Sequence, residues 1–414
     1  MYLKHYLLSI GLGILATTNL SSQTPERHLN HFQATPVTIY IDDIAMNILL
    51  QSPGFTSDLY SLKSLQANLK TASNLPDPEI GGEYLVMPED VDNRWTAEVS
   101  WGVEWPGVYG ARNRESKIKM SAADKAVYSQ RIDKLAEIKD LLLDYAQCRQ
   151  KCQILDKLNK DNETIYQIAQ ETIKGGEMTV LDLNKIKIEY TNIKGAQASL
   201  IEEEAEIIAS LSAIYGKDCS DLVQAMDCRF PDISIPTETD MSFIKTNAPS
   251  LQAAAAEADV LRQSKKVSKM EAFPSLSVGY KHQYEDGMHF NGAVLGISIP
   301  IFSSRGKQKA ANAEIMEADY KVETTAMTIE TEANSVLKRL KLLKRQIDEI
   351  SPLVESIDYE PILLKAYQEG ILSLLDYITE RNYFANAAVE LVSLRYSAAK
   401  AQIQLSKYFQ TYNF

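Results

Sequence analysis

The sequence is poor in the residues that interrupt helices and poor in positive charge. Its 414 residues include only 14 prolines and 18 glycines, which favours long uninterrupted helices. Lysine and arginine number 43 against 55 aspartates and glutamates, giving a formal charge of -12. A chain this acidic repels phosphates, so nucleic acid is set aside as a partner. With 45% apolar residues the chain is too hydrophobic to be disordered, and it is expected to fold.

Long apolar runs are also missing, apart from one near the N-terminus. Residues 6–16 are largely apolar, follow Lys4 and His5, and precede the small and polar stretch 17–22. The run is too short to span a bilayer, and the order is typical of a secretory signal peptide, expected at residues 1–22. A buried N-terminal helix is the alternative. Beyond Ser22 no stretch of 18 apolar residues occurs, so no transmembrane helix is expected in the mature chain.

Cysteine and histidine are scarce. After export the four cysteines would lie in an oxidising compartment, and Cys219 and Cys228, nine residues apart, are expected to form a disulfide. Cys148 and Cys152 are four apart on one expected helix, where packed thiols are expected and a metal pair is the alternative. The sequence does not show Ser, His and Asp in an order typical of a catalytic triad, and its histidines do not stand at the spacing of metal ligands. No catalytic residue, enzyme activity, metal site or cofactor is therefore expected.

What the sequence does contain is an internal duplication. Five pairs of positions match at a spacing of 194 to 196 residues. These pairs are Pro53 with Pro249, Pro78 with Pro274, Pro106 with Pro300, Gly176 with Gly370, and Asp182 with Asp376. The sequence therefore predicts two copies of one unit, at residues 23–216 and 246–414, joined by a linker at 217–245.

Each copy carries the same order of expected elements: a helix, a β-hairpin, a long helix and a return helix. From residue 95 to 105 every odd residue is apolar and every even one is polar or glycine, which indicates a strand. The hairpins are expected at 79–106 and 275–302, the long helices at 109–173 and 304–368, and the return helices at 177–215 and 371–410. A helix of about 65 residues would be on the order of 100 Å long. Pro352 and Pro361 predict a kink or irregular turn in the second long helix.

The strands predict part of a membrane barrel. One face is apolar and aromatic, which suits lipid, and the other is polar, which suits a water-filled lumen. The residues expected to face lipid are Trp95, Val99, Trp101, Val103 and Trp105. Four strands cannot close a barrel, and open edges are not tolerated in lipid, so several copies must assemble. The expected fold class is mainly α with a β-barrel part.

Over nearly its whole mature length the chain resembles the TolC-like outer-membrane efflux proteins. The resemblance rests on the duplicated order of elements, on the strand-to-helix junctions 105–110 and 299–306, and on the turns 176–182 and 370–376. Both turns read G-x-x-[ST]-x-L-D. The resemblance implies a trimeric outer-membrane β-barrel with four strands per chain, continued by a long periplasmic α-helical barrel.

The resemblance also implies a function and partners. The chain would be a passive duct in the outer membrane of a Gram-negative bacterium, serving a tripartite efflux or export system. Its partners would be two further copies of itself, a periplasmic adaptor (membrane fusion) protein, an inner-membrane pump and outer-membrane lipid. A periplasmic adaptor and a coiled-coil scaffold protein of an envelope export complex are the alternatives, although neither explains lipid-suited strands.

A periplasmic gate at the two turns is implied in the same way. Asp182 and Asp376 would form carboxylate rings near the constriction, although a helix N-terminus also favours a carboxylate for structural reasons. Leu372 stands where the family archetype has a basic residue, so the closed state is expected to rest on Tyr367 and apolar contacts. The turn residues expected to contact the adaptor are Gly175, Gly176, Thr179, Gly370 and Ser373.

Overall fold

A computed structural model describes residues 40–88, 93–175, 178–300, 306–408, 412 and 414, all within one unit, Ile39–Phe414. The expected signal peptide lies outside the described residues. The first half contains α1 (Ile41–Gln51), α2 (Pro53–Thr71), β1 (Glu79–Leu85), β2 (Arg94–Val103), α3 (Pro106–Lys174) and α4 (Val180–Tyr215). The second contains α5 (Ser220–Gln224), α6 (Glu238–Asn247), α7 (Pro249–Met270), β3 (Ser275–Glu285), β4 (Met288–Ser298), α8 (Lys307–Glu355), α9 (Tyr359–Gln368) and α10 (Leu374–Ser406).

The same order of elements occurs twice. The series α1, α2, β1, β2, α3, α4 is repeated by α6, α7, β3, β4, α8 with α9, and α10. Proline begins α2 and α7 at matching positions, because the first residue of a helix needs no partner for its N–H. The expected second long helix, 304–368, is two helices in the structure. Its described part breaks between Glu355 and Tyr359, and Pro361 lacks the N–H that a continuous helix would use there.

The helices end where the local sequence favours an end. α3 has 69 residues and begins with Pro106. Gly216 ends α4 with φ +79°, and a Cβ there would lie 2.6 Å from Pro53 Cγ, so only glycine allows α4 to meet the start of α2 this closely. None of the helices in the described part of the chain combines the length and apolarity needed to cross a membrane.

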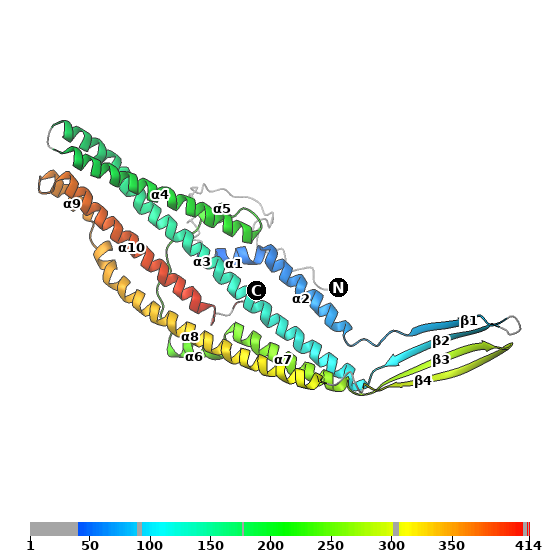
Figure 1. Cartoon of the computed structure of the whole chain (residues 1–414). Helices are drawn as coiled ribbons and strands as arrows, with labels where there is room; N and C mark the ends of the chain where they lie inside the picture. Colours follow the sequence, from blue (N-terminus) through cyan, green and yellow to red (C-terminus); the bar gives the residue numbers. More distant parts are fainter. Residues whose placement is uncertain (1–39, 89–92, 176–177, 301–305, 409–411, 413) are drawn as a thin grey trace, which may run out of the picture. The chain divides into compact units, whose positions relative to one another are not determined.

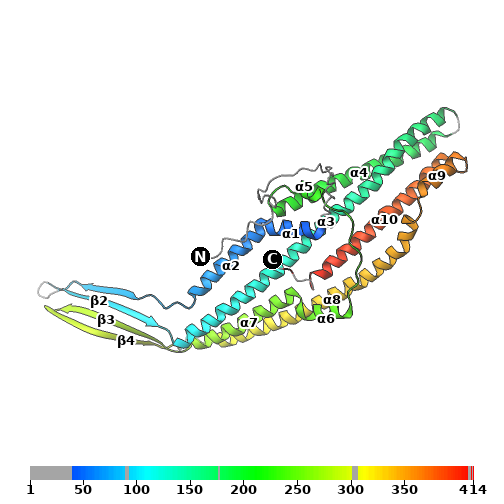
Figure 2. The ribbon, with the colours of Figure 1, turned by 180° about the vertical axis from the view of Figure 1, so that it is seen from behind.

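The four strands form one antiparallel sheet in the order β1, β2, β3, β4. The central pairing, β2 with β3, joins the two halves and sets Val99 opposite Tyr280 and Trp101 opposite Val278. Because directly opposite residues point to the same face, most apolar residues of the four strands share one face, whereas Leu85, Met288, Phe290 and Val294 lie on the other. The sheet lies at one end of the helices, and the α3–α4 and α9–α10 turns lie at the other (Figures 1 and 2).

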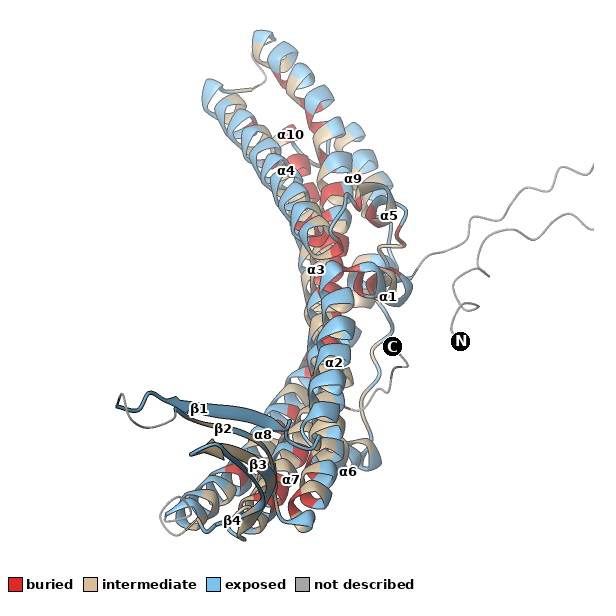
Figure 3. Cartoon of the chain, turned by 90° about the vertical axis from the view of Figure 1, so that its right-hand side faces the viewer, coloured by how far each residue is buried: buried red, intermediate tan, exposed pale blue. Residues whose placement is uncertain are grey.

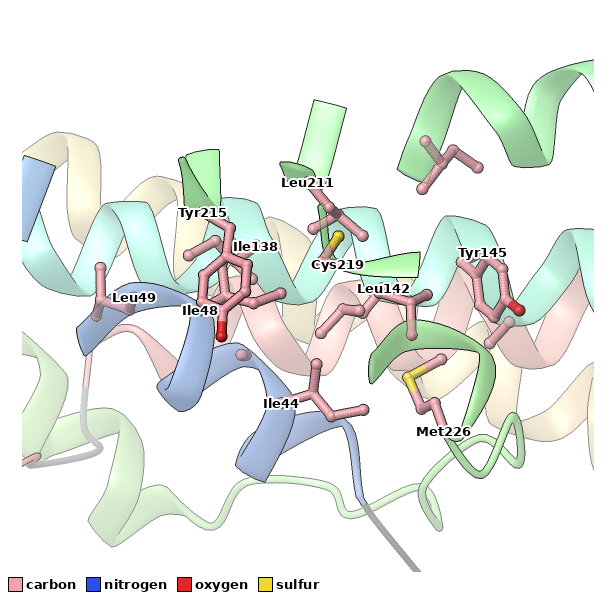
Figure 4. Close-up of a cluster of buried hydrophobic side chains, with 14 of the residues drawn as sticks. Ile44, Ile48, Leu49, Ile138, Leu142, Tyr145, Leu211, Tyr215, Cys219 and Met226 are labelled. Carbon is pink, nitrogen blue, oxygen red and sulfur yellow. The ribbon is translucent and has the colours of Figure 1, made fainter. Parts of the chain in front are cut away.

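Buried residues lie in the helical part (Figure 3). The buried apolar side chains form three clusters. The first packs α1 against α3 and α4 around Ile48, Leu142 and Leu211 (Figure 4). The second includes Leu340 of α8 and Leu405 of α10. The third lies near the turns. No described strand residue is a buried hydrophobic one, so the sheet has no core of its own within a single chain.

The expected disulfide between Cys219 and Cys228 is absent, and all four cysteines are free thiols. Cys219 is buried, with its Sγ 3.2 Å from Ser212 Oγ of α4. The intervening residues form α5, which leaves Cys228 on a different segment with its Sγ toward Met226 O. Proximity in sequence therefore did not bring the two sulfurs together.

Candidate functional site

The apolar face of the sheet is exposed in the single chain. Val99 is 47% exposed, Ile80 of β1 is 84% exposed and Leu295 of β4 is 80% exposed. The exposed members of this face are Ile80, Tyr84, Val99, Trp101, Leu276, Val278, Tyr280, Leu295 and Ile297. An apolar surface of this extent marks contact with a membrane or with another protein.

The residues expected to face lipid are not all equivalent. Trp95 and Val103 are half-buried, and the Trp95 ring lies 5.1 Å from the His282 ring between centroids. Trp105 lies beyond the end of β2, directly before α3, and stacks on Phe273 with centroids 5.8 Å apart. The strand is thus shorter than its alternation suggested, because Pro106 starts the helix.

The opposite face of the sheet carries charged residues in pairs. Glu98 of β2 lies directly opposite Lys281 of β3. Arg94 Nη1 lies 3.2 Å from Glu285 Oε1 at the far end of the same strands. A polar face of this kind suits water rather than lipid.

Both edges of the sheet are open. β1 and β4 are the outer strands, and the described residues provide no further strand to pair with either of them. An open edge presents unpaired N–H and C=O groups and serves as a template for another chain. The sheet can therefore take a further strand at each edge.

Arg112 of α3 joins the two halves where the sheet meets the helices. Its guanidinium donates to Glu104 Oε1 at 3.0 Å and to Glu271 Oε1 at 2.7 Å. Burial by itself would lower the pKa of Arg112, but the hydrogen bonds to Glu271 and Glu104 outweigh burial and raise it. Arg112 therefore stays charged and holds the end of β2 beside the end of α7.

At the first turn, Thr179 and Asp182 cap α4. The N–H of Gly175 donates to Glu171 O at 3.3 Å, and Gly176 lies outside the described residues. Asp182 N donates to the Thr179 hydroxyl at 3.1 Å, and that hydroxyl donates to Asp182 Oδ2 at 2.6 Å. The Thr179 hydroxyl lowers the pKa of Asp182, assisted by Lys185, whose Nζ lies 3.4 Å from Oδ1. Asp182 is therefore an ionised carboxylate at a helix N-terminus.

The second turn is built in the same way. Gly370 has φ +71°, a conformation that favours glycine. The N–H of Leu372 donates to Ala366 O at 3.2 Å and closes the end of α9. Asp376 N donates to the Ser373 hydroxyl at 3.1 Å, and that hydroxyl donates to Asp376 Oδ2 at 2.7 Å. Both turn aspartates thus have the structural role expected of a carboxylate at a helix start.

Tyr367 contacts its own return helix. Its ring stacks on Tyr377 of α10, with centroids 5.5 Å apart. Both belong to the third cluster, in which Ile165 of α3 and Ile186 of α4 also take part. Apolar contacts therefore join the two turn regions of one chain.

The sequence-based prediction did not include Arg381, a buried arginine of α10 near the turns. The Arg381 side chain is only 2% exposed, and its Nε lies 3.1 Å from Glu360 Oε1 of α9. Its Nη1 donates to Asn162 Oδ1 of α3 at 3.4 Å, and the Tyr377 hydroxyl donates to the same Glu360 at 2.8 Å. Leu374, Tyr377, Ile378 and Arg381 follow helical spacing, so the sequence did indicate that Arg381 lies on the buried face of α10.

A groove of about 510 Å³ lies between α4 and α10 near the turns. Lys185 and Glu189 line it from α4, and Thr379 and Tyr383 line it from α10. Val180 and Leu181, at the start of α4, are each 66% exposed. This end of the molecule thus offers both a groove with a mixed polar and apolar lining and exposed apolar side chains.

The described chain thus combines a four-stranded sheet that has one largely apolar, exposed face and two open edges with a duplicated set of long helical hairpins. Residues 242–409 match the family model of outer membrane efflux proteins. The matched segment runs from α6 to the end of α10, so it covers the second of the two repeated series of elements. No curated protein sequence matches the chain.

Three solved structures illustrate the shared fold. A membrane protein from Pseudomonas aeruginosa has a TM-score of 0.75 at 15% identity, covering 93% of this chain and 96% of that one. The CmeC outer membrane channel of Campylobacter jejuni has a TM-score of 0.73 at 16% identity, covering 95% and 94%. The open state of the MtrE outer membrane channel of Neisseria gonorrhoeae has a TM-score of 0.71 at 10% identity, covering 89% and 88%. At these identities the similarity concerns the fold.

Proposed function

We propose that the chain is the outer-membrane channel of a tripartite efflux system in a Gram-negative bacterium. It is a passive duct that receives substrates from an inner-membrane pump and a periplasmic adaptor and releases them outside. The family match and the fold of known outer membrane channels support this function. Passage through a duct needs no catalytic group.

The exposed apolar face of the sheet is the observation that carries the proposal. A sheet this apolar on one face and polar on the other requires lipid on the first and water on the second. Three copies would supply twelve strands, with β4 of one chain pairing to β1 of the next, and would leave no open edge. Neither an adaptor nor a scaffold protein would need such a face.

The gate lies at the opposite end, at the two turns. In a trimer, Asp182 and Asp376 would form two rings of three carboxylates around the axis, which attract cations. The ring contacts of Tyr367, the half-buried Leu372 and the third cluster support a closed state that rests on apolar packing. The Arg381–Glu360 pair adds a polar contact between α9, α10 and α3 to this packing.

The adaptor is proposed to bind at the turns. Gly175, Thr179, Gly370 and Ser373 lie at the two turns, and the groove between α4 and α10 opens near them. Gly176, also expected to contact the adaptor, lies outside the described residues. The Thr179 and Ser373 hydroxyls are engaged in capping, so the exposed Val180 and Leu181 supply the apolar contact area.

The test is assembly and conductance of the purified, detergent-extracted protein. The expected result is a trimer that dissociates only when heated in denaturing detergent, and that forms channels in planar bilayers. A monomer that stays dissolved without detergent would contradict the proposed function.

A further inference from the structure

Two histidines lie side by side at the distal end of the sheet, away from the gate. His282 of β3 and His289 of β4 are diagonal neighbours across the β3–β4 pairing, close to the turn at Asp286 and Gly287. Their facing nitrogens, His289 Nδ1 and His282 Nε2, are 3.2 Å apart. His289 is exposed and His282 is half-buried. By register both histidines lie on the face that Val99 and Tyr280 share, at its end next to the β3–β4 turn, and the pair lies within one chain.

The surroundings of His282 determine which of its nitrogens is available. Its Nδ1 lies 2.6 Å from Asn291 Oδ1, which also accepts a hydrogen bond from the Tyr280 hydroxyl at 2.7 Å. An amide oxygen only accepts, so Nδ1 carries the proton and Nε2 keeps its lone pair. A hydrogen bond of this kind to the non-ligating nitrogen orients the imidazole in metal sites.

The spacing of the two nitrogens fits a shared metal ion. Imidazole nitrogens bind Zn²⁺ at about 2.0–2.1 Å, so two of them at angles between square and tetrahedral are about 2.9–3.4 Å apart. The observed 3.2 Å lies within this interval. Without a metal, His289 Nδ1 carries a proton and donates it to the lone pair of His282 Nε2. His289 becomes a ligand when this proton moves to its own Nε2, which changes neither the charge nor the position of the ring.

We propose that His282 and His289 together bind a borderline divalent transition metal ion, of the class of Zn²⁺, Ni²⁺ and Cu²⁺. These are the ions that imidazole ligands favour. No three His, Cys, Asp or Glu side chains cluster as a metal site within the described residues, so water completes the coordination. The site is accordingly open and exchangeable rather than structural.

Trp95 provides a local signal for binding. Its ring centroid lies 5.1 Å from that of His282, and it is one of only three tryptophans in the chain. Cu²⁺ bound by the pair would quench this ring far more strongly than a more distant one. The Trp95→Phe variant should therefore lose most of the quenching while still binding Cu²⁺.

The experiment titrates Cu²⁺ into the purified full-length protein in detergent, followed by tryptophan fluorescence and by electron paramagnetic resonance. The expected result is quenching together with a spectrum showing coupling to two nitrogens. His289→Gln, at an exposed position, should raise the midpoint about tenfold or more, on the scale of losses in metal affinity caused by perturbing a site. His282→Gln is the second variant and should behave alike.

The control variant is His28→Gln combined with His31→Gln, which removes the other two histidines beyond the expected signal peptide. It should bind Cu²⁺ with an unchanged midpoint and spectrum. An unchanged midpoint and an unchanged two-nitrogen spectrum in His289→Gln and His282→Gln would overturn the proposal.

Discussion

Single buried charges connect distant parts of this chain. Lys139 of α3 lies 2.7 Å from Asp42 of α1 and 2.9 Å from the Tyr412 hydroxyl near the C-terminus. Burial would lower the pKa of Lys139, but the hydrogen bonds to Asp42 and Tyr412 outweigh burial and raise it. Near the turns, buried Arg381 connects α10 to Glu360 of α9 in the same way. At the residue scale, such contacts are the ones whose removal should be felt most.

Replacing Arg381 by Met should destabilise the region near the turns. Loss of one partner from a buried ion pair costs about 3–5 kcal/mol, and because Glu360 is one-third exposed we expect about 1–3 kcal/mol here. Arg395→Met, on the same helix, is the matched control. Arg395 pairs with Glu355 at a more exposed site, so its loss should cost about 0–1 kcal/mol. Hydrogen exchange of α9 amides and the melting temperature measure the difference, and equal effects of both variants would contradict the assignment.

The free thiols predict a specific labelling pattern. Burial raises the pKa of Cys148 to about 12, and it also raises the pKa of Cys152. Both thiols are therefore protonated at neutral pH and should resist alkylation in the folded protein, because the thiolate is the reactive form. After denaturation without a reducing agent, all four cysteines should be labelled, as counted by mass spectrometry. If only two cysteines were labelled, the other two would be joined by a disulfide, contrary to the structure.

At the element scale, the register between the strands decides which residues share a face of the sheet. Val99 opposite Tyr280 and Trp101 opposite Val278 place the apolar residues of β2 and β3 on one face. A slip of one residue would move each of them to the other face. The alternation of each strand is local, whereas the agreement between strands requires this pairing.

Arginine substitutions distinguish the two faces of β2. Val99→Arg should cost about 2–4 kcal/mol if Val99 lies near the bilayer midplane, because a charge there faces lipid. Thr96→Arg is the control, since Thr96 lies between Glu83 and Gln283 on the polar face. It is a better control than Glu98→Arg, which would set two positive charges opposite each other at Lys281. The readout is the yield of heat-modifiable trimer in membranes, and equal losses would show that the faces are wrongly assigned.

At the scale of the whole molecule, the end with the sheet and the end with the two turns differ in what they expose. The sheet has two open edges, at β1 and β4, and the turns present two carboxylates per chain, Asp182 and Asp376. Asp182 is partly compensated by Lys185, whose Nζ lies 3.4 Å away. The two proposed rings should therefore contribute unequally to the field at the constriction.

Neutralising the turn carboxylates should reduce cation selectivity. Asp376→Asn should lower the reversal potential in a salt gradient across a planar bilayer, and Asp182→Asn should lower it less. The helix caps Thr179 and Ser373 are unchanged in these variants, and an asparagine Oδ1 can still accept from their hydroxyls, so the turns should remain folded. Tyr367→Phe retains the ring stacked on Tyr377 and should raise resting conductance only if the hydroxyl contributes to closure. Unchanged selectivity in the double Asn variant would place the constriction elsewhere.

Much of the local structure could be predicted from the residues. The alternation at 95–103 predicted a strand, and the structure has β2 there. The expected first long helix, 109–173, is α3, although α3 begins three residues earlier, at Pro106, because proline suits the first position of a helix. The match to outer membrane efflux proteins agrees with the resemblance drawn from the duplicated pattern.

The sequence by itself determined the periodicity of each element, because strand and helix periods follow from the backbone and are visible in a short window. Only the tertiary structure decided which elements meet. Arg381 finds Asn162 across 219 residues, Val99 finds Tyr280, and Cys219 turns toward Ser212 instead of Cys228. These partners depend on how distant helices and strands pack, and no local pattern of residues specifies that packing.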